Sequence, residues 1–192
     1  MRNDEMGDSL DMSKRLLLHA FDGVDLFPLI CPLPSQREFD FKLFKRIFGV
    51  KGSSISMMVT PPADAFWGRK RSRHWEQLEE AVLRGKFAST KVILLDPDKG
   101  IHRSKRNNKV VHVNEVAWLI SKLRKRVLAI YHHAYADNLS YSAAINLFQT
   151  YPRFGYDFGA AAILFLQAPG GQTVFRKVKR IVCSTLKPSR MF

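Results

Sequence analysis

The stretch KVILLDPDKG, residues 91–100, decides the fold of this chain. Residues 91–95 form a short apolar run, which is typical of a strand buried on both faces of a sheet. Runs of the same kind recur at 127–131 (VLAIY) and 160–167 (AAAILFLQ). Helical segments lie between these runs. The alternation predicts a parallel sheet covered by helices on both faces.

Five segments are expected to form helices, most of them because apolar residues recur at i, i+3 and i+4. They are 38–48, 72–84, 114–126, 140–151 and 173–186, the last of which could also be an edge strand. Ser72 and Asn114 are suited to cap the second and third of these helices, because their side chains accept hydrogen bonds from backbone amides.

The N-terminal part has a different pattern. Two apolar runs at 16–21 and 24–30 are separated by Asp22-Gly23, which predicts a tight β-hairpin because glycine accepts positive φ. The whole pattern predicts a single-domain, Rossmann-like α/β fold over residues 1–192. In it a mostly parallel sheet carries helices on both faces and follows the N-terminal β-hairpin, and residues 1–13 are expected to be flexible.

The composition, 46% hydrophobic and 25% charged, fits a folded domain. No apolar run approaches the ~18 residues that span a bilayer. Residues 1–15 contain acids and lack the apolar core of a secretory signal, so we expect a cytoplasmic protein outside the membrane. Cys31 and Cys183 are isolated and without metal-binding spacing, and we expect two buried thiols.

The chain is strongly basic. It has 31 Lys and Arg against 17 Asp and Glu, a net charge of +14 that attracts polyanions. Nucleic acid is therefore the expected partner, although a charge excess can also serve solubility alone. Basic residues gather at 69–73, 99–109 and 176–190. The residues expected to bind nucleic acid are Arg69, Lys70, Arg71, Arg103, Lys105, Arg106 and Lys109.

Polar side chains follow two of the predicted strands at the point where each strand ends. They are Asp96, Asp98 and Lys99 after the first strand, and His132 and His133 after the second. The carboxyl ends of neighbouring parallel strands meet at one edge, where open α/β sheets bind ligands. We therefore expect these residues to converge on a catalytic site.

Carboxylates and imidazoles together suit Mg²⁺, Mn²⁺ or Zn²⁺. Asp96 and Asp98 are the candidate metal ligands, and His132 or His133 is the candidate ligand or proton carrier. Lys99 could neutralise the charge of a phosphate. Because side chains alternate along a strand, at most one of the two histidines is expected to act. Asp-Pro-Asp-x-Gly is also a sound turn, so a purely structural role for this segment stays open.

Several familiar enzyme signatures are absent from the sequence. It contains no GxxxxGK[ST] phosphate loop and no GxSxG nucleophile turn. It also lacks GxGxxG after an early strand, and the expected Asp22-Gly23 hairpin occupies the place of a cofactor loop. Glu115 is expected to be a helix-start carboxylate, and Trp75 a core residue.

Four further motifs stand out: LLDPDKGI at 94–101, HVNEVAWL at 112–119, IYHH at 130–133 and FLQAP at 165–169. Through these motifs the chain resembles a family of uncharacterised bacterial proteins of about this size, over roughly residues 72–170. The resemblance implies a Rossmann-like fold and no established reaction. Asp96-Pro97 also looks like the Asp-Pro that methyltransferase-like Rossmann proteins place beside the substrate base.

Three functions follow from these features. The first hypothesis is a nucleic-acid-directed, metal-dependent phosphodiester hydrolase that uses Mg²⁺ or Mn²⁺ at the strand ends. The alternative enzyme is a methyltransferase-like protein that binds S-adenosylmethionine, although no cofactor glycine loop is recognisable. The third is an accessory protein that binds nucleic acid or a protein partner without catalysis.

Overall fold

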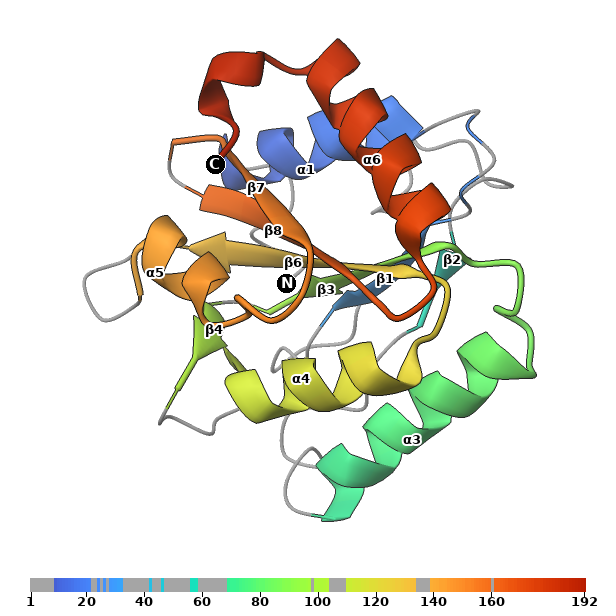
Figure 1. The fold of residues 1–192 in the computed structure, drawn as a ribbon. Helices are drawn as coiled ribbons and strands as arrows, with labels where there is room; N and C mark the ends of the chain where they lie inside the picture. The colour runs from blue at the N-terminus through green and yellow to red at the C-terminus, as the bar shows by residue number, and fades with distance from the viewer. Residues whose placement is uncertain are drawn as a thin grey trace.

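A mixed β-sheet lies at the centre of the structure (Figure 1). The computed structural model of the chain describes residues 9–21, 24, 26, 28–32, 42, 46, 56–58, 69–97, 99–103, 110–133, 139–159 and 161–192. Within these residues the sheet has six strands in the order β2-β1-β3-β6-β8-β7. They are β1 (Leu29–Pro32), β2 (Ser56–Met57), β3 (Val92–Asp96), β6 (Val127–His133), β7 (Arg153–Asp157) and β8 (Ala161–Gln167).

Most of this sheet is parallel. β1 pairs in parallel with β2 and β3, and β3 pairs in parallel with β6. β8 pairs antiparallel with both β6 and β7, so β7 runs in the direction of β3 again. The α/β class and the mostly parallel sheet are therefore confirmed, whereas the strand predicted at 160–167 runs opposite to the expected direction.

The strand β7, which the sequence pattern did not predict, explains this reversal. Its residues Phe154 and Tyr156 are buried, and it leads into β8 after only three residues. A connection that short permits an antiparallel hairpin, whereas a parallel crossover needs about a dozen residues or more.

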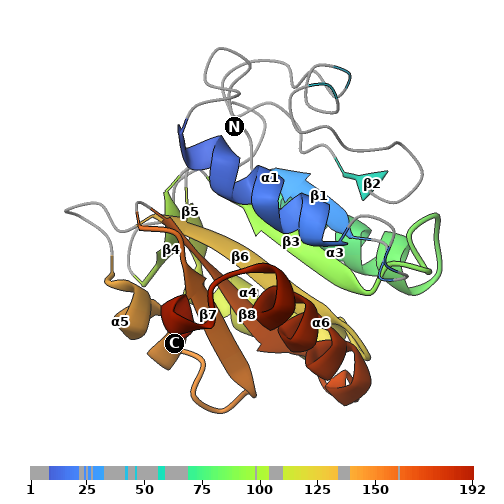
Figure 2. The same ribbon diagram turned by 90° about the horizontal axis from the view of Figure 1, so that it is seen from above.

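Helices cover both faces of the sheet (Figures 1 and 2). One layer contains α1 (Ser9–Phe21) and α6 (Gln172–Thr185), and the other contains α3 (Arg69–Leu83) and α4 (Val113–Lys122). The short helix α5 (Tyr141–Asn146) precedes β7, and the 3₁₀ turn η3 (Pro188–Arg190) follows α6. In the described part of the chain, no helix is long and apolar enough to cross a membrane.

A small second sheet stands beside the carboxyl ends of the central strands. It pairs β4 (Gly100–His102) with β5 (Val110–His112) in parallel. Neither strand was predicted; β4 lies within the segment 99–109 in which basic residues gather, and β5 follows it. Arg103 directly follows β4, and α4 begins directly after β5.

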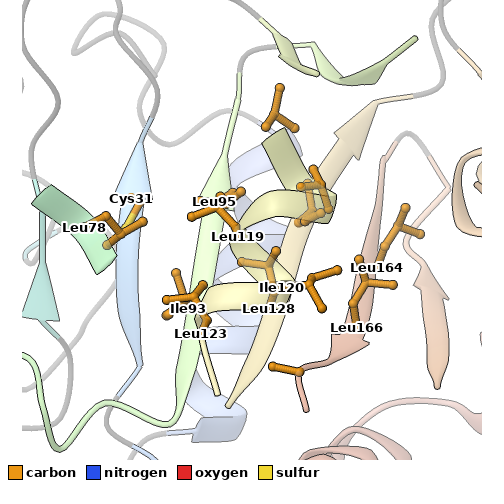
Figure 3. Packing of buried hydrophobic residues seen from close by; sticks show 14 of the residues in the cluster. Cys31, Leu78, Ile93, Leu95, Leu119, Ile120, Leu123, Leu128, Leu164 and Leu166 are labelled. Atoms are coloured by element: carbon orange, nitrogen blue, oxygen red, sulfur yellow. The ribbon is translucent and has the colours of Figure 1, made fainter. Parts of the chain in front are cut away.

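The core has two halves because side chains alternate along each strand. In β3, Ile93 and Leu95 point toward α3 and α4, where they meet residues such as Leu119 (Figure 3). Val92 and Leu94 point the other way and pack with residues of α1 and α6. Of the two cysteines, Cys31 is buried, and burial raises the pKa of its thiol, whereas Cys183 is half-buried.

The predicted N-terminal hairpin is not found, because residues 16–21 belong to α1. Leu17, Leu18 and Phe21 bury one side of this helix, while Leu16 is 50% exposed. A run such as LLLHAF is compatible with either a strand or a helix, and here the packing against the sheet decides for a helix. Asp22 and Gly23 lie outside the described residues.

The predicted helix ends differ in part. Only Lys42 and Arg46 of the segment 38–48 are described, and both are helical. α3 begins at Arg69 and not after Ser72, and the N-cap of α4 is His112 and not Asn114. The last helix, α6, matches the predicted segment 173–186 closely.

The amino ends of β3 and β6 are joined through one buried guanidinium. Arg126 is 8% exposed and donates hydrogen bonds to the carbonyl oxygens of Thr90 (3.0 Å) and Arg124 (2.8 Å). It also donates to the carbonyl oxygens of Val82 (2.7 Å) and Ala88 (3.2 Å). This side chain thus ties the end of α3 to the start of both strands.

The outer edge of β7 is covered by residues that follow α6. Phe192 exchanges two backbone hydrogen bonds with Gly155, and Met191 forms a β-bridge with Tyr156. The ring of Phe192 lies over Gly155 so closely that a Cβ atom there would stand 2.3 Å from it. A residue with a Cβ atom at position 155 would therefore displace the ring of Phe192.

Candidate functional site

The site begins where the chain changes direction in the sheet. From β1 the chain moves outward to β2 and then returns to form β3 on the other side of β1. In open α/β sheets, ligands bind outside the carboxyl ends of the strands at such a switch point. Here the two carboxyl ends are Pro32 and Asp96, which are partners in the parallel register.

Asp96 and Pro97 form one rim of this switch point, and both are buried. The Asp96 side chain is 3% exposed, and strand alternation places it on the same face as Val92 and Leu94, toward α1 and α6. A carboxylate so near the end of a buried strand can accept hydrogen bonds from a ligand at the edge. Lys99 is exposed, whereas Asp98 lies outside the described residues.

His132 is fully buried, and both its ring nitrogens are engaged. Nδ1 accepts a hydrogen bond from the backbone N–H of Ile101 at 3.1 Å, and Nε2 donates to the carbonyl oxygen of Leu139 at 2.8 Å. Burial lowers the pKa of His132, although the bond to Leu139 opposes this shift. The ring is therefore neutral and joins β4 to β6, which gives His132 a structural role.

Gly100 is required by the position of this ring. Its φ is +88°, and a Cβ atom there would stand 2.3 Å from Nδ1 of His132 and 2.9 Å from its Cα. Any other residue at position 100 would have a strained backbone at this φ, and its Cβ atom would collide with His132. The glycine of the Asp-Pro-Asp-x-Gly segment thus lets β4 approach β6.

His133 lies on the face opposite to His132, as strand alternation predicts. It is 5% exposed, and its ring meets that of Tyr131 edge-on, with centroids 4.8 Å apart. Tyr131 packs in the same half of the core as Leu94. Asp96, Tyr131 and His133 therefore share one face at the carboxyl edge, on neighbouring strands.

The predicted metal site is only partly within the described residues. Among these residues, no group of three or more His, Cys, Asp or Glu is placed to hold a metal ion. Of the two expected ligands, Asp96 is at the edge as predicted, and Asp98 falls outside the described part. Because both its ring nitrogens are hydrogen-bonded, His132 could coordinate a metal ion only if its bond to Ile101 or to Leu139 broke.

Arg71, expected to bind nucleic acid, lies inside the protein. It is 7% exposed, and its Nε and Nη2 donate to the two oxygens of Glu115, the latter bond being 2.6 Å long. Nη2 also donates to the carbonyl oxygen of Val110 at 2.7 Å. Arg71 thus joins α3 to β5 and α4, and these bonds engage its Nε and Nη2 inside the protein.

Glu115 is the acceptor at the centre of this cluster. It accepts hydrogen bonds from Nε1 of Trp75 (3.1 Å) and from the backbone N–H of His112 (2.8 Å), the second of which closes a capping box. Burial alone would raise the pKa of Glu115, but the bonds from Arg71 and these donors lower it. The predicted helix-start role of Glu115 and the core position of Trp75 are confirmed.

Other predicted nucleic-acid-binding residues do face solvent. Arg69 and Lys70 are exposed in the first turn of α3, and Arg103 is exposed after β4. Because the neighbouring Arg71 bonds to β5, this first turn lies on the side of the carboxyl edge. Lys105, Arg106 and Lys109 lie outside the described residues.

Comparisons with known proteins add little to this site. No family model matches the chain, and no curated protein matches it. Among solved structures, it is similar to the crystal structure of protein LPL1258 from Legionella pneumophila, described with the family model DUF519. The identity is 9%, the TM-score is 0.44, and the match covers 97% of this chain and 94% of that chain. A likeness at this level carries no argument about function.

Proposed function

We propose that this chain is a methyltransferase-like protein with a Rossmann-like fold, which binds S-adenosylmethionine at the switch point and acts on nucleic acid. One observation carries the proposal: Asp96-Pro97 ends the strand that borders the switch point. Methyltransferase-like Rossmann proteins have an Asp-Pro at this place.

The order of the first elements removes one objection to this proposal. The sequence suggested that a hairpin at Asp22-Gly23 takes the place of a cofactor loop. However, the first strand of the sheet is Leu29–Pro32, and Asp22-Gly23 precedes it. The part of the chain that follows β1, where a cofactor loop would be expected, lies outside the described residues.

S-adenosylmethionine supplies a methyl group that is activated by its positively charged sulfur. The residues of this chain would orient the acceptor. A carboxylate accepts hydrogen bonds and does not donate them, so Asp96 suits an amino group on a base. His133 lies on the same face, with its ring against that of the buried Tyr131, and would pack beside that base. Holding the amino nitrogen in one orientation is a large part of the rate gain in such transfers.

A nucleic acid is the acceptor that the charge of the chain favours. The net charge is +14, and Arg69, Lys70 and Arg103 are exposed on the side of the carboxyl edge. Positive side chains around a site attract phosphates and raise the rate of encounter.

The proposal is tested by two measurements on the same variants. Titration calorimetry with S-adenosylmethionine should show binding to the wild type and to Asp96→Asn, which keeps the shape of the side chain. Transfer of a labelled methyl group to DNA or RNA should fall by ~10²-fold or more in Asp96→Asn, because the acceptor is no longer oriented. Asp157→Asn on β7 is the matched control and should keep full activity. A wild type that binds no S-adenosylmethionine would disprove the proposal.

The metal-dependent hydrolase is the second candidate, and Asp96 at the strand edge is the observation in its favour. In that case Mn²⁺ should raise the melting temperature of the wild type relative to EDTA, because a ligand that binds only the native state stabilises it. Asp98→Asn should abolish both that gain and the cleavage of DNA or RNA. If neither cofactor binds, the accessory protein without catalysis becomes the preferred function.

A further inference from the structure

The outer side of α6 carries positive charge and no negative charge. Arg176, Lys177, Lys179 and Arg180 are all exposed, and Val178 and Val182 bury the opposite side. At 1.5 Å per residue, these four charges occupy ~6 Å of helix. Mutual repulsion at that density is unfavourable unless anions neutralise it, because no acidic residue occurs in α6.

The neighbouring helix of this layer also exposes basic side chains. α1 lies beside α6 on the same face of the sheet (Figure 2). Its described exposed side chains are Arg15, Leu16 and His19, and its sequence also includes Asp11, whose side chain lies outside the described part. By contrast, α3 in the opposite layer mixes Arg69, Lys70 and Arg73 with Glu76 and Glu80. The uninterrupted row of basic side chains is thus a property of α6 in the described part of the chain.

We propose that this surface, the outer side of α6, binds the sugar-phosphate backbone of a nucleic acid duplex. Lys and Arg side chains on a convex helix fit a regular row of phosphates. The exposed residues of the helix other than these four are Gln172, Thr173, Ser184 and Thr185, which are hydroxyl or amide side chains that also contact phosphates. The inference goes beyond the proposed function, because it does not depend on methyl transfer.

Two other polyanions fit the same surface less well. Proteins that lie on a membrane insert apolar side chains into the headgroup region, and the outer side of α6 exposes none. Proteins that bind single strands stack bases on exposed aromatic rings, and Phe175 of α6 is partly buried in the core. A duplex, whose bases are already stacked and whose phosphates face outward, needs neither.

The test compares two variants that each lose four positive charges. One carries Arg176→Gln, Lys177→Gln, Lys179→Gln and Arg180→Gln on α6. The other carries Arg84→Gln, Lys86→Gln, Lys122→Gln and Arg124→Gln, which are exposed residues of the opposite layer and its turns. Glutamine preserves the helix propensity of the α6 set. Circular dichroism and urea unfolding should show that both variants remain folded.

Fluorescence anisotropy with a duplex DNA of defined length, over a range of salt concentrations, gives the result. Each phosphate contact contributes ~0.9 to the slope of log affinity against log salt, so the α6 variant should lose ~2 to 4 units of slope and at least ~10-fold in affinity at low salt. The control should lose less than one such unit. Equal losses in both variants would mean that net charge alone attracts DNA, and would overturn the proposal.

Further ligands in the same assay decide between the polyanions. Duplex RNA should depend on α6 as duplex DNA does, because the shared backbone is the ligand. If the α6 variant instead loses binding only to a single strand, or only to vesicles of anionic lipid, the surface serves that partner and the proposal is wrong. A wild type that binds no S-adenosylmethionine but loses duplex binding in the α6 variant would disprove the proposed function and leave this inference intact.

Discussion

The two ends of the central strands use buried polar side chains in different ways. At the amino ends, Arg126 donates hydrogen bonds only to backbone carbonyl groups. At the carboxyl ends, His132 is bound in the same manner, between Ile101 and Leu139. Asp96 and His133 lie at that same edge but on the opposite face, beside the switch point. A buried guanidinium or imidazole whose hydrogen bonds all go to the backbone stabilises the fold. Chemistry at the carboxyl ends is then left to the neighbouring residues, Asp96 and His133.

The largest effect is expected at the carboxyl end, from Gly100→Ala. The added Cβ would collide with His132, and the backbone would keep a φ that strains an alanine. Together these effects should cost ~2 to 5 kcal/mol of the free energy of unfolding, measured with urea. Gly159→Ala is the matched control, because Gly159 also has a positive φ, +97°, but nothing within 4 Å of the added atom.

That control should lose only ~1 to 2 kcal/mol from backbone strain. If both alanine variants lose the same free energy of unfolding, the contact with His132 contributes nothing. The carboxyl end would then be less closely packed than the structure indicates.

At the amino end, Arg126→Met should cost ~2 to 4 kcal/mol in the same assay. The apolar chain fills a similar volume, but it leaves the carbonyl oxygens of Thr90 and Val82 without this donor. Arg126→Lys should recover little, because one ammonium group cannot reproduce the spread of the guanidinium donors. Arg124→Met, on an exposed side chain next to it, should change stability by less than ~0.5 kcal/mol. Full rescue by lysine would contradict the assigned geometry.

The smallest of the three effects is a dependence on pH. Burial lowers the pKa of His74 in the folded protein to about 4, and the charge of Arg71 adds to this shift while Glu115 opposes it. The unfolded chain, with an ordinary pKa near 6.5, then binds the proton more readily. The contribution of His74 is therefore complete above about pH 6.5 and is lost as the pH falls toward 4.

The free energy of unfolding should accordingly drop by ~2 kcal/mol between pH 7 and pH 5 from His74 alone. Burial also lowers the pKa of His132, which adds to the drop. His74→Gln should flatten the pH profile. A profile that His74→Gln leaves unchanged would show that His74 is not the group that titrates.

Much of the sheet could be predicted because its central strands are continuously apolar. Val92–Asp96 and Val127–His133 are buried along their whole length, and such runs have few alternatives in an α/β chain. The direction of β8 could not be predicted in this way, because periodicity does not tell parallel from antiparallel. Only the shortness of the connection from β7, once that strand was recognised, would have indicated a hairpin.

The site was predicted less well than the sheet, and Arg71 and Lys70 show why. The two residues are adjacent and basic, yet one is buried against Glu115 and the other is exposed. Which of the two is buried depends on which one faces Glu115, a residue that lies several elements later in the chain. No local sequence pattern contains this information. A signal did exist for His132: the glycine at position 100 indicates a close approach of two backbones. It could not show which residue approaches.

The ring of Phe192 over Gly155 has a consequence for the behaviour of the protein in concentrated solution. An open edge strand offers its backbone groups to any other strand, and native proteins protect such edges. Here the protection is a short stretch of the same chain, held by backbone bonds to Gly155 and by the bridge at Tyr156. Any substitution that expels this stretch from Gly155 would leave β7 as an open edge strand that can pair with another molecule. The absence of a side chain at Gly155 thus helps to prevent edge-to-edge association.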